Sequence, residues 1–283
     1  MKCLPLTLLI AIAILVVSCQ KEVNGTTDVT TTVKLVSKIH ETDDRLPMQG
    51  VYYDFEYDAQ QRVTRLRQLS TDSSGGSVDV IEDNDYYFHY IGADNKPFKV
   101  TLTPTATNWT WYFKYDGQGR KIQDSIVDLS WPDTDVANYT YNGNQIIATF
   151  LDAGTWNNLY RDTIFYDGTN ISKQVLMREE NNFLLMWWED QFTYDNNPNP
   201  LYQLNIGSMF FFTIHPAGIE TYLGLNKNNV TVLREKDFED PTSGTYTEPS
   251  TFTYDADGYP VLRIAPNPFD PAERNVIRYE YRQ

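Results

Sequence analysis

Cysteine, histidine and positive charge are all scarce in this chain of 283 residues, which has two Cys, three His, and 23 Lys plus Arg against 38 Asp plus Glu. Two cysteines are too few for a disulfide-rich scaffold or a zinc ribbon. A formal net charge of −15 argues against a nucleic-acid-binding protein, because such proteins carry a basic excess. The sequence therefore predicts no metal site, no cofactor and no nucleic-acid partner.

Recognisable catalytic patterns are missing as well. The histidines at 40, 89 and 215 stand in neither HExxH nor HxH spacing, and no GxSxG, Walker or GxGxxG sequence occurs. Carboxylates are numerous enough to supply a glycosidase pair, but most Asp residues stand where turns are expected. The sequence favours a protein that is not an enzyme and has no catalytic residue. A polysaccharide-active hydrolase, with its carboxylates inside the fold, is the alternative.

The N-terminus has the features of an export signal. Lys2 precedes an apolar run over residues 6–17, and this run of about a dozen residues is shorter than the roughly 20 that span a membrane. The run ends in Val16-Val17-Ser18-Cys19, which resembles the lipobox of bacterial lipoprotein precursors, where the cysteine receives diacylglycerol. We expect a signal peptide over 1–18, lipidation of Cys19 and a flexible tether over 19–32. An ordinary secretory signal with an incidental cysteine is the alternative.

The residues after Cys19 resemble a second targeting signal. Gln20-Lys21-Glu22 resembles the short signal that directs some Bacteroidota lipoproteins to the cell surface. A residue other than Asp directly after the lipidated cysteine also fits the outer membrane. This resemblance implies a lipid-anchored outer-membrane protein, exposed at the cell surface or facing the periplasm.

Aromatic residues are abundant, with 20 Tyr, 14 Phe and 6 Trp, and many recur at a regular spacing. A tyrosine with Asp or Asn close behind it returns about every 26 residues, apart from one gap of 60. A degenerate copy around Leu225 divides that gap, which makes about nine units. The tyrosines, which we call the anchors, are Tyr57, Tyr90, Tyr115, Tyr141, Tyr166, Tyr194, Tyr254 and Tyr281.

Each unit has the pattern of a β-hairpin. Apolar and polar residues alternate before each anchor, as in Phe55-Glu56-Tyr57 and Phe113-Lys114-Tyr115, which is typical of a strand with one buried face. The Asp or Asn after the anchor and the Gly that follows predict a turn. We therefore predict an all-β domain over 33–283, with about nine consecutive antiparallel hairpins in one large curled sheet, an open barrel or a roll.

One copy also carries a family resemblance. The stretch Tyr115-Asp116-Gly117-Gln118-Gly119-Arg120 resembles the YD (Rhs-type) repeat, whereas the Tyr57 copy has Gln61 where the motif has Gly. Together with the lipobox, the chain resembles the YD-like repeat lipoproteins of Bacteroidota over roughly 31–283. The resemblance implies consecutive hairpins that curl into a continuous sheet.

Four tryptophans are candidates for ligand binding. Each stands an even number of residues before an anchor, so an unbroken strand would place both on one face. They either cap the aromatic core or line a groove and stack on sugar rings. We expect a binding or scaffold module for a glycan or another envelope protein. A structural subunit of an envelope assembly is a further alternative. The candidates are Trp109, Trp131, Trp156 and Trp188.

Overall fold

Most described residues belong to one antiparallel β-sheet. The computed structural model describes residues 33–45, 49–72, 78–103, 109–128, 134–151, 159–180, 183–206, 224–240, 242, 244–266 and 273–282. The proposed signal peptide, Cys19 and the tether lie outside this range, as do Trp131 and Trp156. No helix in the described part of the chain is long and apolar enough to cross a membrane.

The strands follow one another along the chain, and the short 3₁₀ helix η3 lies between β12 and β13. Their bounds are β1 Val36–Asp43, β2 Gly50–Tyr57, β3 Val63–Asp72, β4 Asp79–His89, β5 Lys99–Thr103, β6 Trp109–Tyr115, β7 Lys121–Asp128, β8 Thr134–Asn142, β9 Gln145–Leu151, β10 Leu159–Asp167, β11 Asn170–Glu180, β12 Phe183–Pro198, η3 Tyr202–Leu204, β13 Asn228–Asp237, β14 Thr245–Pro249, β15 Thr251–Tyr254, β16 Pro260–Pro266 and β17 Arg274–Tyr281.

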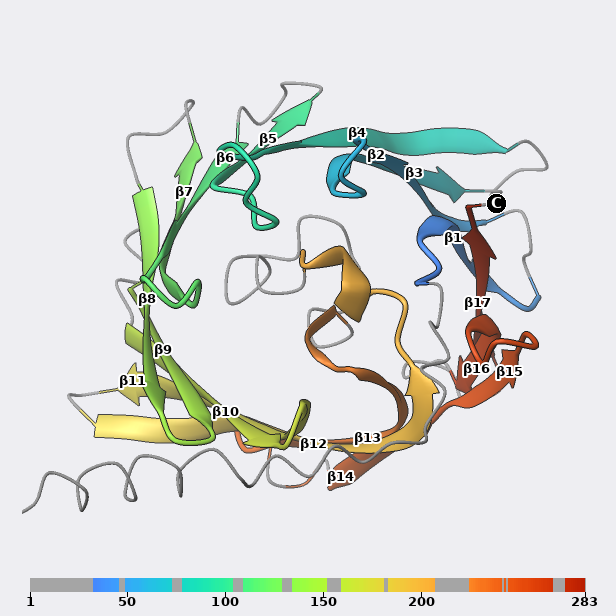
Figure 1. Ribbon diagram of the computed structural model, residues 1–283. Helices are drawn as coiled ribbons and strands as arrows, with labels where there is room; N and C mark the ends of the chain where they lie inside the picture. The colour runs from blue at the N-terminus through green and yellow to red at the C-terminus, as the bar shows by residue number, and fades with distance from the viewer. Residues whose placement is uncertain are drawn as a thin grey trace, which may run out of the picture. The chain divides into compact units, whose positions relative to one another are not determined.

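The sheet is a meander that curls into a barrel. Strands from β1 to β14 pair in chain order, β15 continues the order through β16 to β17, and β17 returns to pair with β1 (Figure 1). Only Ser250 separates β14 from β15, and the two pair with different neighbours, β13 and β16. β14 and β15 therefore act as two halves of one strand, which links β13 to β16 in the sheet. The predicted all-β curled sheet is confirmed.

The predicted count of about nine hairpins is wrong. Seven anchors stand at or next to the C-terminal end of a strand, and Tyr194 lies four residues before the end of β12, so there are eight units. Leu225 is not the anchor of a ninth unit, because it lies on the segment that returns into β13. The gap of 60 residues is one hairpin, β12 and β13, whose connection carries η3 into the ring of strands (Figure 1). Residues of this connection pack on the barrel's core.

Strand alternation separates an inner apolar wall from an outer polar wall. On β3, Leu66 is fully buried in the core, whereas Arg65 and Arg67 on either side of it make ion pairs on the opposite face. The core is inside, because Leu201 and Leu204, which belong to the connection within the ring, pack in the same cluster as Leu66.

The hydroxyl groups of seven of the eight anchor tyrosines bond the preceding hairpin. The hydroxyl of Tyr90 donates to the carbonyl oxygen of Val63 at 2.8 Å, and that of Tyr115 donates to Pro97 at 2.9 Å. The hydroxyl of Tyr254 bonds the carboxylate of Asp195 instead. These bonds lie at one end of the barrel, which we call the anchor rim. The other bonds of this kind run from Tyr57 to Val36, Tyr141 to Lys121, Tyr194 to Ile171 and Tyr281 to Pro260.

The residues after the anchor build the turn and reach the next unit. Asp116 accepts the backbone N–H groups of Gln118 and Arg120, both at 2.9 Å, and the Nε of Arg120 at 2.8 Å. Gly119 between them has φ 73°, a value that favours glycine. The guanidinium of Arg120 then lies over the ring of Tyr141, the next anchor. The predicted Asp and Gly turn chemistry is thus confirmed at this copy.

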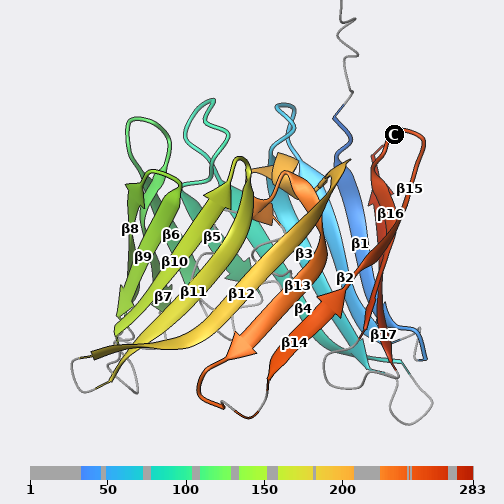
Figure 2. The same ribbon diagram turned by 90° about the horizontal axis from the view of Figure 1, so that it is seen from below.

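Figure 2 shows the barrel from the side. The short turns after the anchors lie at one end, and β1 also begins there (Figure 2). The first strand of the barrel therefore starts at the anchor rim.

Candidate functional site

Each hairpin unit contributes one equivalent pair of residues to the inner wall. These residues lie directly opposite each other on neighbouring strands, on the same face as the anchors. In the first three units the pairs are Ile39 with Tyr53, Leu66 with Tyr86, and Val100 with Trp111. All six side chains are buried and apolar or aromatic. This half of the inner wall is an ordinary hydrophobic core.

The next three units replace these side chains with small and polar ones. Their equivalent pairs are Asp124 with Ala137, Ala148 with Asp162, and Gln174 with Asp190. One of these residues comes from each strand from β7 to β12, so they form a continuous arc of the wall. We call these six residues the polar sector.

A buried lysine lies at one end of the polar sector. The Lys121 ammonium is 2.6 Å from Asp124 Oδ2, and the hydroxyl of Tyr139 donates to the same oxygen at 2.6 Å. Lys121 Nζ also lies 4.3 Å from the ring centroid of Tyr139. Burial lowers the pKa of Lys121 to about 8, against the opposing effect of Asp124. Burial likewise raises the pKa of Asp124. The ion pair and the hydrogen bond from Tyr139 still satisfy one oxygen of this carboxyl.

The centre of the polar sector is a carboxyl group with an amide neighbour. Gln174 Nε2 donates to Asp162 Oδ2 at 2.5 Å, and the Asp162 side chain is only 1% exposed. Burial raises the pKa of Asp162 well above its usual range, and the charge of Asp190 acts in the same direction. These conditions favour the neutral acid. Asp190 in turn accepts a hydrogen bond from Trp188 Nε1 at 2.8 Å.

Two oxygen atoms of the polar sector have no hydrogen-bond partner among the residues that the structure describes. Asp124 Oδ1 and Asp162 Oδ1 are both buried without a hydrogen bond. The remaining two units behave differently, because Glu248 and Arg263, their polar members, bond each other at 2.9 Å. Charged groups of the inner wall are therefore mutually satisfied in those units and incompletely satisfied in the polar sector.

Half-buried rings continue the wall from the polar sector away from the anchor rim. Tyr160 precedes Asp162 by two residues on β10, so it lies on the same face. Its ring centroid is 5.9 Å from that of Phe150 and 5.6 Å from that of Trp187. The guanidinium of Arg178 lies 5.0 Å from the Trp187 ring centroid. These side chains present ring faces next to hydrogen-bonding groups.

The described part of the connection inside the barrel contacts both halves of the wall. Leu201, Leu204 and Ile206 pack in one cluster with core residues of β1 to β7 and Ile277. Leu225, near the end of the connection, packs against the second core cluster, which includes Ala137, Ala148 and Ile164. The backbone N–H of Ile171 on β11 also donates to Asn226 Oδ1 at 2.7 Å.

The two candidate tryptophans that the structure describes lie in different surroundings. Trp109 packs against the first core cluster with its ring 6.1 Å from that of Trp111, which fits the interpretation that it caps the core. Trp188 is half-buried beside the polar sector, where it bonds Asp190. Trp131 and Trp156 lie outside the described residues. The sequence analysis did not single out the polar sector, although aligning the units on their anchors reveals it. The fourth residue before the anchor is Tyr53, Tyr86 and Trp111 in three units, then Ala137, Asp162 and Asp190.

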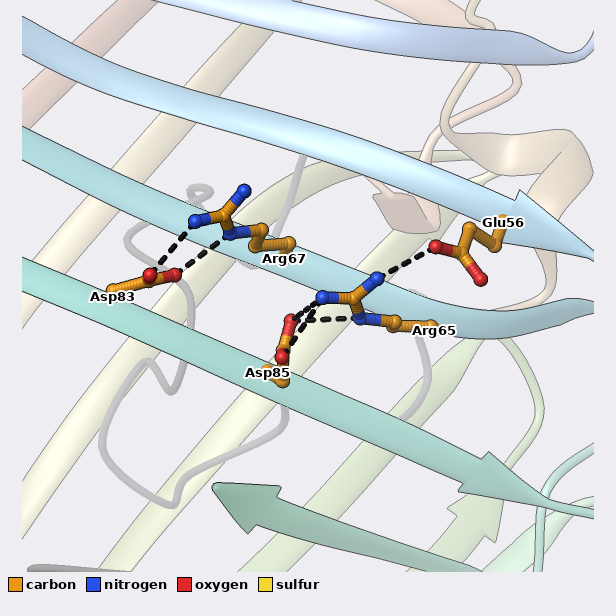
Figure 3. Close-up of polar contacts among 5 residues, drawn as sticks. All are labelled: Glu56, Arg65, Arg67, Asp83 and Asp85. Carbon is orange, nitrogen blue, oxygen red and sulfur yellow. Dashed lines mark hydrogen bonds and ion pairs between the residues drawn. The ribbon is translucent and has the colours of Figure 1, made fainter. Parts of the chain in front are cut away.

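The outer wall of β2 to β4 carries charged side chains along the strands. Arg65 bonds Asp85 through Nε at 2.8 Å and Glu56 through Nη1 at 2.7 Å, and Arg67 bonds Asp83 at 2.7 Å (Figure 3). The Glu56 side chain is 60% exposed. Arg67, Asp83 and Asp85 lie well inside β3 and β4, whereas Glu56 is next to the last residue of β2.

Two solved structures share this fold. A porin-like protein from Bacteroides uniformis superimposes with a TM-score of 0.55 at 17% identity, over 87% of this chain and 98% of that one. A porin-like protein from Bacteroides vulgatus gives a TM-score of 0.55 at 12% identity, over 88% of this chain and 99% of that one. Neither the protein-family models nor the curated proteins yield a match to this sequence. The chain therefore shares the β-barrel fold of these two proteins.

Proposed function

We propose that this protein is a lipid-anchored binding module of the outer membrane whose barrel stands in water and carries no enzymatic activity. The observation that carries the proposal is the arrangement of the barrel's two faces. A barrel that spans a bilayer presents an apolar band about 25 Å tall to the lipid and a polar interior. Here the ion pairs of Arg65 and Arg67 occupy the outer face, and apolar side chains fill much of the inner face.

The energetic cost of lipid contact supports this arrangement. An arginine at the bilayer midplane on the outside of a barrel costs about 2–4 kcal/mol, and two such residues would stand side by side on β3. A lipid chain on Cys19 supplies membrane attachment without that cost. The tether over 19–32 would then hold the anchor rim toward the membrane, because β1 begins at that rim. The opposite rim would face outward, on the cell surface.

Membrane partition of the full-length precursor tests this proposal. In a Cys19→Ala variant, we expect the protein to leave the membrane fraction and to remain folded in detergent-free buffer, with the circular dichroism of a β-protein. Palmitate labelling should disappear in the same variant. A Cys3→Ala variant is the matched control, and it should keep both the label and the membrane association. Retention of the unlabelled Cys19→Ala protein in carbonate-washed membranes would show that the barrel itself is embedded.

A hydrolase is the second candidate, and one observation favours it. Asp124 and Asp162 are inner-wall carboxyls whose pKa values are both raised by burial, and glycosidases use a carboxyl of raised pKa as a general acid. Release of reducing ends from polysaccharides by the purified protein, lost in Asp162→Asn, would establish this activity.

A further inference from the structure

We propose that the polar sector is a binding site for a neutral carbohydrate, contacted by the side chains of Asp162, Gln174 and Asp190. This inference rests on the proposed function of a binding module and names its ligand class and its site. Of the two candidate tryptophans that the structure describes, Trp188 lies beside the site and Trp109 packs against the first core cluster.

The first argument is that the polar sector departs from the barrel's own repeat. Three units show what the position requires for stability, namely an aliphatic side chain opposite an aromatic one, as in Leu66 with Tyr86. Ala137 and Ala148 give up most of the apolar area that such pairs bury, and each large aromatic buries 150–250 Å². A substitution of this kind in three adjacent units sacrifices core stability, which points to a purpose other than packing.

The second argument is the pair of unsatisfied oxygens. An unmade hydrogen bond on a buried polar atom costs about 1–3 kcal/mol. Asp124 and Asp162 each bear such an oxygen on the inner face, and both side chains are 1% exposed. A ligand with hydroxyl groups would supply the missing donors. Gln174 on β11 adds an amide group to the site, and Asp190 on β12 adds a carboxylate.

The charge balance favours a neutral ligand over a cation. Asp124 is compensated by Lys121, and burial favours the uncharged form of Asp162. Asp190 is held by the indole N–H of Trp188. A cluster built for a cation would keep several carboxylates ionised, and no group of three or more metal-ligating side chains occurs among the described residues.

The neighbouring rings favour a sugar among neutral ligands. Tyr160 and Trp187, with ring centroids 5.6 Å apart, lie next to the polar sector and are half-buried. Carbohydrates bind where ring faces stand beside hydrogen-bonding side chains, because a pyranose has an apolar face and a polar edge. The polar sector and these rings offer both.

Glycan binding by the full-length lipidated protein in detergent tests the proposal. We would apply it to an array of neutral and acidic bacterial, plant and animal glycans, and would titrate the strongest neutral oligosaccharide by calorimetry. The expected result is binding of a neutral glycan that weakens by about tenfold in Asp162→Asn, which corresponds to about 1.4 kcal/mol. Asp190→Asn is the second variant if Asp162→Asn fails to fold. The matched control is Asp83→Asn on the outer wall, which should leave the affinity unchanged.

Several outcomes would overturn the inference. One is the absence of binding to every neutral glycan on the array by a protein that is folded. Another is an affinity for the neutral glycan that Asp162→Asn and Asp190→Asn both leave unchanged. A third is a preference for acidic glycans, or displacement of the neutral glycan by the polyamine spermine. None of these outcomes affects the release of the Cys19→Ala variant from membranes, so the two proposals fail separately.

Discussion

The guanidinium of Arg62 lies 4.5 Å from the ring centroid of Tyr90, the anchor of the next hairpin unit. Arg120 stands in the same relation to Tyr141, at 4.6 Å. Arg282 lies 5.2 Å from the ring of Tyr57, so a similar contact crosses the junction where the last strand meets the first. In these three cases, the arginine of one unit therefore makes a cation–π contact with the anchor tyrosine of the next unit.

Removal of one such arginine should lower the free energy of unfolding of the barrel. Arg62 also bonds Asp58 at 2.7 Å and the carbonyls of Gly92 and Asp94 at 2.8 Å. We expect Arg62→Ala to lower the free energy of unfolding by about 2 kcal/mol, through the lost cation–π contact and hydrogen bonds. Urea unfolding followed by tryptophan fluorescence measures this. The control is Arg234→Ala, at an exposed residue of β13, which should change the free energy of unfolding by less than about 0.5 kcal/mol. An equal loss in both variants would contradict a stabilising role for the contacts of Arg62.

Gln61 occupies the glycine position of the first turn with φ 63°, which is a strained conformation for a residue with a Cβ. We expect Gln61→Gly to stabilise the protein by roughly 1 kcal/mol, because the left-handed conformation costs a non-glycine residue about 1–2 kcal/mol. Thermal unfolding monitored by circular dichroism checks the sign. Gln60→Gly, one residue earlier and outside the left-handed region, should instead destabilise. A lower melting temperature for Gln61→Gly would refute the argument.

The hydrogen bond of an anchor hydroxyl should contribute to the stability of the barrel. Tyr115→Phe keeps the ring and removes the bond to the carbonyl of Pro97, so a loss of about 1 kcal/mol is expected. Tyr112→Phe is the control, since Tyr112 is an exposed tyrosine of the outer face at 41% exposure. Guanidinium denaturation of the two variants gives the comparison. Indistinguishable midpoints would mean that the anchors act by ring packing alone.

Buried Asp162 should make stability fall as the pH rises. Its pKa is raised in the folded protein, so above the ordinary carboxyl pKa of about 3.9 the unfolded chain releases a proton that the folded chain retains. The resulting cost is absent in acid and grows until the pH passes the folded pKa. We expect Asp162→Asn to be more stable than the native protein at pH 7, with a smaller difference at pH 4. Melting temperatures across this range measure it, with Asp83→Asn as control; a native advantage at pH 7 would contradict the assignment.

The local chemistry of the units was predictable because it depends on neighbours in sequence. Phe113-Lys114-Tyr115 specifies a strand with one buried face, and Asp116 and Gly119 specify its turn. The hairpin count could not be settled in this way. The segment around Leu225 has the residues of a turn, but the long connection before it places that segment on the return path into β13.

The sequence by itself determined the strands, the turns, the anchors and the all-β fold, since alternation and turn propensity act within a few residues. Only the tertiary structure decided which face is inside, where the connection packs on the wall, and that Asp124, Asp162 and Asp190 lie on one arc. These facts depend on how β17 meets β1 and on the register of strands far apart in the chain. Registers of that kind are fixed by closure of the whole sheet, a property that no single hairpin contains.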